Sequence, residues 1–193
     1  MLFRSSNAAF WLCAGAIGPQ AVTVTGLNLH SAQGDRKILD VLERFGAGIQ
    51  KTEDSVTVSP EKLSGIALDA SDIPDLVPVI SAVACRAAGE TRIEHAERLR
   101  IKESDRIQSV CALLNAFGAD YTEKPDGMII RGGKPLHGAT VSSYNDHRIA
   151  MTAAVMSLLT DSAITIEQAE SVNKSYPSFY QDYRRLGGQE EES

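Results

Sequence analysis

Charged residues that could handle protons and anions concentrate in two short runs of this 193-residue chain. The first run is Lys-Glu-Ser-Asp-Arg at residues 102–106, and the second is Asn-Asp-His-Arg at residues 145–148. Lysine and arginine bind phosphate and carboxylate groups, while a positioned carboxylate or imidazole can transfer a proton. Together the runs predict acid–base chemistry on an anionic ligand.

Six apolar segments predict helices, and the charged runs stand at the starts of two of them. The predicted helices are residues 7–17, 34–46, 74–88, 102–118, 146–159 and 176–188. The first, third and fifth are apolar nearly all round, which indicates burial on every side. The second and fourth have apolar residues at helical spacing on one face, so we expect them to cover a sheet.

The chain also repeats itself at an interval of about seventy residues. Phe45-Gly46-Ala47 recurs as Phe117-Gly118-Ala119, and Leu186-Gly187-Gly188 resembles a third copy. Strand-like segments follow the three apolar helices, at residues 18–28, 89–97 and 161–170. We therefore predict one α/β lobe of three pseudo-symmetric units with buried helices and outer sheets. The units are approximately residues 5–65, 66–135 and 136–188, with an acidic tail at 189–193.

Pseudo-symmetry of these units would bring all six helix starts toward one end of the lobe. Helix starts carry free N–H groups and the positive end of the dipole, so together they would form an anion site. The cations that would reinforce this site are Lys102, Arg106, Arg148 and Lys174. The first unit offers Ser5–Asn7 and residues 33–36 at the equivalent points.

Each of these residues, taken alone, also has an ordinary structural explanation. Asp75, Asp105 and Asp146 are of a type that commonly caps helices. Lys102 and Glu103 could form a solvated first turn. What favours a functional site is that charges of both signs recur at equivalent points of the repeat.

The overall composition narrows the class of protein. A net charge of −6 argues against non-specific nucleic-acid binding, so an anionic ligand needs a local basic cluster. Cys13, Cys85 and Cys111 lie in apolar segments without metal-ligand spacing, which predicts reduced core residues and a cytoplasmic protein. Residues 1–21 imitate a secretory signal, but the repeat favours a buried helix there. No apolar run is long enough to span a membrane.

The charged runs and their surroundings resemble one known family. Residues 100–107 (RIKESDRI) and 144–151 (YNDHRIAM), with 74–79 (PDLVPV) and 172–188 (VNKSYPSFYQDYRRLGG), are similar to the C-terminal half of 5-enolpyruvylshikimate-3-phosphate synthases. Residues 33–47 also fit, so the resemblance covers about residues 5–188 in order.

The resemblance implies a transferase of the shikimate pathway, which leads to chorismate and the aromatic amino acids. Members of the family move the enolpyruvyl group of phosphoenolpyruvate to the 5-hydroxyl of shikimate 3-phosphate and release phosphate, without a metal or an organic cofactor. Their fold has two similar lobes, each an inside-out α/β barrel of three units, with the active site in the cleft between the lobes.

The resemblance also implies roles for individual residues. Asp75 matches an aspartate that contacts the shikimate hydroxyl and is a proposed proton acceptor, and Lys102 matches a lysine that contacts the shikimate phosphate. Glu103 matches a candidate proton donor to the methylene carbon of phosphoenolpyruvate, and His147 matches a site-lining histidine. The residues that match phosphoenolpyruvate-binding cations are Arg106, Arg148 and Lys174.

Two family features have no counterpart in this sequence, namely the Lys-Ser motif and the Gly-rich segment of the N-terminal lobe. We therefore expect a C-terminal lobe that needs the missing N-terminal lobe as its partner and is inactive alone. One alternative is a non-catalytic phosphate-binding module that reuses the lobe. Another is a lobe of the related transferase that acts on a UDP-sugar, although the two charged runs and the lack of a loop cysteine argue against it.

Overall fold

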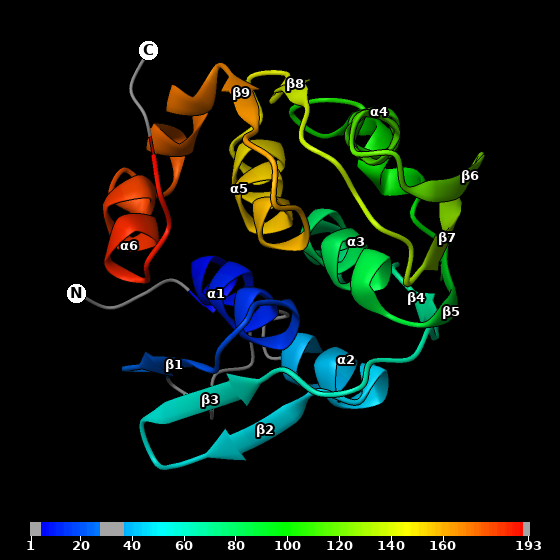
Figure 1. The fold of residues 1–193 in the computed structure, drawn as a ribbon. Coiled ribbons are helices and arrows are strands. Elements are labelled where there is room, and N and C mark those ends of the chain that lie inside the picture. Colours follow the sequence, from blue (N-terminus) through cyan, green and yellow to red (C-terminus); the bar gives the residue numbers. More distant parts are fainter. Residues whose placement is uncertain (1–4, 28–36, 191–193) are drawn as a thin grey trace.

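The computed structural model describes residues 5–27 and 37–190, with side chains from Asn7 onward (Figure 1). In the described ranges the α-helices are α1 (Ser5–Ile17), α2 (Lys37–Phe45), α3 (Val77–Arg86), α4 (Arg106–Ala116), α5 (His147–Met156) and α6 (Phe179–Arg185). The strands are β1 (Val22–Thr25), β2 (Gly48–Lys51), β3 (Ser55–Ser59), β4 (Ala67–Asp69), β5 (Gly89–Glu94), β6 (Asp120–Lys124), β7 (Gly127–Gly132), β8 (Thr140–Ser142) and β9 (Thr165–Glu167). Short 3₁₀ helices are η2 (Pro74–Leu76), η3 (Glu97–Ile101), η4 (Ser157–Leu159) and η5 (Ala169–Lys174).

Helices α1, α3 and α5 pack against one another at the centre of the lobe (Figure 1). Residues 7–17 of α1 are all buried, and so are Val77–Cys85 of α3. In α5 every residue except Arg148 is buried. A helix that is apolar all round is stable only where neighbours cover each of its faces. The sequence prediction of three central helices is therefore confirmed.

Each central helix contacts strands of the sheet on its own side of the lobe (Figure 1). Strands β1-β3-β2 form an antiparallel sheet against α1, and β8 and β9 form a parallel pair beside α5. The third sheet has the order β4-β5-β7-β6 and lies against α3, with β4 parallel to β5 and the other pairs antiparallel. The fold is thus α/β with buried helices and outer sheets, as predicted.

The order helix–strand–helix–strand–strand occurs twice along the chain. The first copy runs from α1 to β3, and the second runs from α3 to β7 and is preceded by the additional strand β4.

The two Phe-Gly-Ala segments of the sequence repeat lie at the C-terminal ends of α2 and α4. Gly46 and Gly118 have φ of 98° and 75°, which favours glycine, and the next N–H of each bonds back five residues to Leu42 or Leu114. The recurring motif is therefore a helix C-cap. The unit boundaries remain predictions.

The predicted helix at 102–118 begins later than expected, at Arg106. Asp105 has extended backbone angles and caps α4 by accepting from the Gln108 N–H, so Lys102, Glu103 and Ser104 form a loop ahead of the helix. Apolar spacing shows that a helix exists, whereas its first residue depends on the cap. The binding candidate Lys102 and the catalytic candidate Glu103 therefore lie on a loop.

The three cysteines lie in the core as free thiols. Burial raises the pKa of each thiol, to about 12 for Cys85 and Cys111. These groups are protonated at neutral pH and are therefore weak nucleophiles and poor metal ligands. Among the helices in the described part of the chain, none is both long and apolar enough to cross a bilayer.

Candidate functional site

The starts of α3, α4 and α5 meet at one edge of the lobe and bring charged side chains from distant parts of the chain together. The residues are Asp75 of η2, Lys102 and Glu103 of the loop before α4, Arg106 of α4, and His147 and Arg148 of α5. Six of the seven residues predicted from the sequence therefore share one site. The seventh, Lys174, lies at the end of η5, which packs against α5.

Asp75 is the carboxylate on which three cations converge. Its Oδ1 lies 2.7 Å from Nη1 of Arg106 and 3.2 Å from Nζ of Lys102, and its Oδ2 lies 3.8 Å from Nη2 of Arg148. Partial burial would raise the pKa of Asp75, but the charges of Arg148, Lys102 and Arg106 outweigh it and lower the pKa. Asp75 is therefore ionised at neutral pH and able to accept a proton or a hydrogen bond.

Arg106 is buried between two carboxylates, with only 3% of its side chain exposed. Its Nε and Nη2 donate to the two oxygens of Asp146 at 2.7 and 3.2 Å, and its Nη1 donates to Asp75 at 2.7 Å. The side-on pairing uses the planar fork of the guanidinium, which a lysine could not reproduce. Arg106 is thus fixed in place, and its interaction with phosphoenolpyruvate stays a prediction.

Asp146 is fully buried and joins two of the helix starts. In addition to the hydrogen bonds from Arg106, its carboxylate accepts hydrogen bonds from Oγ of Ser104 at 3.1 Å and from the backbone N–H of Arg148 at 2.9 Å. Burial would raise the pKa of Asp146, but its bonds to Arg106 and the charge of that group prevail, so the pKa is lowered. The prediction that Asp146 caps a helix is correct, and the same carboxylate also anchors Arg106.

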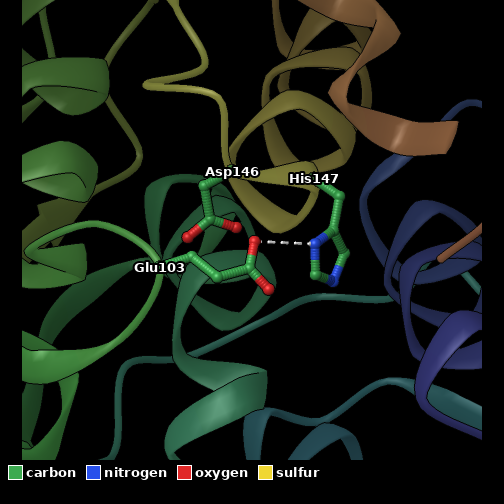
Figure 2. Close-up of side chains that lie close together, drawn as sticks. All are labelled: Glu103, Asp146 and His147. Atoms are coloured by element: carbon green, nitrogen blue, oxygen red, sulfur yellow. Dashed lines mark hydrogen bonds and ion pairs between the residues drawn. The ribbon is translucent and has the colours of Figure 1, made fainter. Parts of the chain in front are cut away.

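Glu103 and His147 form a pair beside this anchor. Figure 2 shows Glu103 between Asp146 and His147, with Nδ1 of His147 lying 3.1 Å from Oε2 of Glu103. Burial and the charge of Arg148 lower the pKa of His147 more than Glu103 raises it. The imidazole is therefore neutral at pH 7 and, with its proton on Nδ1, donates to a Glu103 carboxylate that remains 43% exposed.

Glu103, Asp146 and His147 also place potential metal-ligand atoms within 4.8 Å of one another, the one such group in the described ranges. Both oxygens of Asp146 already accept bonds from Arg106, whose fixed positive charge opposes a second cation nearby. The donor set therefore does not suit a metal ion. With three further cations in or beside it, the site suits anions instead.

Lys174 approaches the site through a turn with unusual backbone angles. Its Nζ donates to the backbone carbonyl of Asn145, the residue before Asp146. Tyr144 and Asn145 both have φ of 53°, which is uncommon for residues other than glycine, and the Asn145 N–H donates to Oε1 of Gln168 at 3.0 Å. The turn directs the Asn145 carbonyl toward the lysine and so fixes the ammonium at the edge of the site.

In the first unit, the one predicted side chain that the structure describes is that of Asn7. Asn7 in the first turn of α1 is buried, and its Nδ2 donates at 3.3 Å to the carbonyl of Ser175, next to Lys174. Helix α1 therefore supports the segment that carries the lysine. The side chains of Ser5 and Ser6 and the whole of residues 33–36 lie outside the described part of the chain.

Sequence reasoning missed the second role of Asp146 and the contribution of Ser104. The available signal was indirect, because a buried arginine at a helix start requires a carboxylate partner. The sequence offered several aspartates, and the pairing of Arg106 with Asp146 spans 40 residues. Nothing in the local pattern selects that partner over the others.

The family described as EPSP synthase (3-phosphoshikimate 1-carboxyvinyltransferase) matches residues 5–183 of the chain. The chain belongs to the EPSP synthase family. The match contains all six residues gathered at the helix starts and also Lys174.

Curated relatives in this family are similar along almost the whole chain. The 3-phosphoshikimate 1-carboxyvinyltransferase of Clostridium kluyveri is 46% identical over 187 residues, which are 97% of this chain and 44% of the relative. That of Clostridium acetobutylicum is 45% identical, covering 95% of this chain and 42% of the relative. The chain thus spans less than half the length of these EPSP synthase relatives.

Solved structures also match almost the whole of this chain and less than half of the matched protein. A structure of EPSP synthase from Acinetobacter baumannii matches with a TM-score of 0.80 and 30% identity, over 93% of this chain and 45% of that one. The enolpyruvyl transferase NikO from Streptomyces tendae matches with a TM-score of 0.73 and 20% identity, over 96% of this chain and 43% of NikO. The second likeness concerns the fold alone. This EPSP synthase family chain therefore has the fold of one lobe of an enolpyruvyl transferase.

Proposed function

We propose that this chain is one lobe of an EPSP synthase and that, together with a second lobe, it transfers the enolpyruvyl group of phosphoenolpyruvate to the 5-hydroxyl of shikimate 3-phosphate. The observation that carries the proposal is the convergence of Lys102, Arg106 and Arg148 on Asp75, next to the pair of Glu103 and His147. This arrangement offers cations for anionic substrates and two partly exposed carboxylates for proton transfer.

The two carboxylates suit the two proton transfers of the reaction. The hydroxyl oxygen must lose its proton as it adds to carbon 2 of phosphoenolpyruvate, while carbon 3 gains a proton. Loss of phosphate and of a carbon-3 proton then restores the double bond. We assign proton acceptance from the hydroxyl to Asp75, which is ionised. We assign proton delivery to carbon 3 to the protonated form of Glu103, and the carboxylate left by this step, held by Nδ1–H of His147, can then take back a proton from carbon 3.

The cations of the site can bind the negatively charged groups of the two substrates. Phosphoenolpyruvate carries a phosphate and a carboxylate, and shikimate 3-phosphate carries one of each as well. We assign contact with the shikimate phosphate to Lys102 and contact with phosphoenolpyruvate to the cations at the other helix starts. The phosphoenolpyruvate-binding residues in this proposal are Arg106, Arg148 and Lys174. Arginine suits this role because its planar fork binds carboxylate and phosphate through two parallel bonds.

Neither alternative function gains support from the structure. The related transferase that acts on UDP-sugars uses a loop cysteine as an acid, as the family resemblance implied, whereas Cys13, Cys85 and Cys111 are buried in helices here. A phosphate-binding module without catalysis would not need Glu103 and His147 paired beside the cations. We therefore retain the transferase as the single proposal.

The test is complementation with the N-terminal half of the Clostridium kluyveri relative, fused ahead of residue 5 of this chain. Phosphate release is measured with both substrates for the fusion and for this chain alone. Turnover is expected in the fusion and not in the chain alone, because the second lobe closes the site. Phosphate release by the chain alone, or a folded fusion that binds neither substrate, would contradict the proposal.

A further inference from the structure

Arg100, two residues before Lys102, forms a network that the proposed chemistry does not use. Its Nε donates to the carbonyl of Pro125 at 2.8 Å, and its Nη1 donates to Oδ2 of Asp105 at 3.0 Å. Its Nη2 donates to Oε1 of Glu123 and to the carbonyl of Lys124, both at 3.0 Å. All three guanidinium nitrogens are engaged, with acceptors from two separate parts of the chain.

The pairing of Arg100 with Asp105 closes the loop that carries Lys102 and Glu103. Asp105 uses its other oxygen, Oδ1, to cap α4 through the Gln108 N–H at 3.0 Å. A residue of η3, just before the loop, is thereby bonded to Asp105, which ends the loop and caps α4. This guanidinium therefore helps to set the position of the loop relative to α4, together with the hydroxyl of Ser109 on α4, which donates to Oγ of Ser104 at 3.1 Å.

The remaining bonds of Arg100 attach the loop to the β6–β7 hairpin. Glu123 and Lys124 end β6, and Pro125 lies in the turn that follows. On the other side of the loop, Ser104 donates to the buried Asp146. Apolar packing contributes little between these two anchors, because the side chain of Ile101 is 85% exposed. Polar anchors on both sides therefore position the loop.

We propose that Arg100 is a positioning residue that holds the Lys102 ammonium and the Glu103 carboxylate in their working places. What these two residues do rests on the proposed function, but the anchoring of the loop does not. Small displacements of a reacting group cost large factors in rate, so a loop with catalytic residues gains from rigid support. Lysine cannot replace Arg100, because one ammonium group cannot span acceptors on both the loop and the hairpin.

A simpler explanation is that Arg100 only adds a surface ion pair of small value. Arg131 on β7 provides the matched control, because it is also a partly exposed arginine with several partners. It donates to Asp120 at 3.3 Å and to Thr122 at 3.1 Å, and its Nε lies 3.4 Å from Glu90. Those partners lie on β5 and β6 and not on the loop before α4.

The first test exposes the folded chain to Glu-C protease and measures two cleavage rates by mass spectrometry. One is cleavage after Glu103 in the loop, and the other is cleavage after Glu53 in the exposed β2–β3 turn. The quantity compared between variants is the ratio of the first rate to the second. Cleavage requires local opening, so Arg100→Gln should raise the ratio about 10-fold, and Arg100→Lys by nearly as much. Arg131→Gln should leave it within about 2-fold of the wild type. Equal effects of the two glutamine substitutions, or none from Arg100→Gln, would overturn the proposal.

The second test measures steady-state kinetics of the same variants in the fusion described above. Arg100→Gln should lower kcat about 10-fold and raise KM for shikimate 3-phosphate, since both Glu103 and Lys102 lose their positions. Arg131→Gln should match the wild type. If Arg100→Gln speeds cleavage after Glu103 but leaves kcat and KM unchanged, Arg100 anchors the loop without affecting turnover. That result would overturn the positioning role. An inactive wild-type fusion would instead contradict the proposed function, and the cleavage ratio would still decide whether Arg100 anchors the loop.

Discussion

Two ion-pair clusters of this EPSP synthase family chain use the same residue types in different surroundings. They are the helix-start cluster of Asp75, Arg106 and Asp146, and the outer-sheet cluster of Glu90, Asp120 and Arg131. In each, one arginine lies between two carboxylates. The arginine of the first is 3% exposed, and that of the second is 41% exposed.

The difference in burial changes what each pairing does. Water and salt screen the outer-sheet cluster, so its pairs at 3.3 and 3.4 Å contribute little to stability. The helix-start cluster is screened less, and the fully buried Asp146 stays charged because Arg106 and the Arg148 N–H stabilise its carboxylate. A cluster of this kind costs desolvation free energy and in return fixes the geometry of the groups around it.

The largest expected effect is on catalysis. In the fusion with the N-terminal half, Glu103→Gln should lower the rate of phosphate release by about 10² to 10⁴, the usual range for a positioned acid or base. Asp75→Asn should lower it by a similar factor for the same reason. Glu90→Gln in the outer-sheet cluster is the control and should leave the rate unchanged. A comparable loss in the control would remove the functional distinction between the clusters.

The next effect is on stability. Asp146→Ala should lower the free energy of unfolding by about 3–5 kcal/mol, because it leaves the buried Arg106 with one carboxylate fewer and two further donors unpaired. Urea unfolding of this chain measures the change. Asp120→Ala should give a much smaller change, since water replaces the ion pairs that Asp120 forms with the exposed side chains of Arg131 and Lys134. Equal losses would show that burial does not separate the two clusters.

Ligand binding should separate the clusters as well. Arg148→Ala should weaken phosphoenolpyruvate binding to the fusion by about 10- to 100-fold, the value of a hydrogen bond between charged groups. Isothermal titration with Arg131→Ala as the control checks this. Unchanged affinity in Arg148→Ala would contradict the assignment of the anion site.

The smallest effect is a pH dependence of opposite sign at two histidines. Burial lowers the pKa of His147, so its stabilising contribution is present above the unfolded-state value near 6.5 and is lost as the pH falls below it. A hydrogen bond to Asp69 raises the pKa of the exposed His95, so its contribution is present below about 6.5 and is lost as the pH rises through the folded-state value. Urea unfolding between pH 5 and 8 should show that His147→Gln flattens the rise of stability with pH, whereas His95→Gln steepens it. Slope changes of the same sign would show that one of the two directions is wrong.

Much of the fold could be predicted because it follows from local patterns. The three central helices were predictable because residues 7–17, 74–88 and 146–159 are apolar on every face. The Phe-Gly-Ala repeat marked real equivalent points, because each copy is a C-cap that needs a positive φ at its glycine. The sequence prediction placed the start of α4 four residues too early, because the spacing of apolar residues does not show where a helix is capped. Asp105, a residue type that commonly caps helices, was a signal for the correct start.

The sequence by itself determined which residue types stand at the helix starts, and hence the family and the prediction that the site binds anions. Only the tertiary structure decided which charges pair, because Arg106 lies 31 residues from Asp75 and 40 from Asp146, and Arg148 lies 73 from Asp75. It also decided that the Asp146 side chain is fully buried whereas Asp75 is 41% exposed. Local patterns record helix caps and charge runs, whereas burial and pairing depend on how three helices from different parts of the chain pack together.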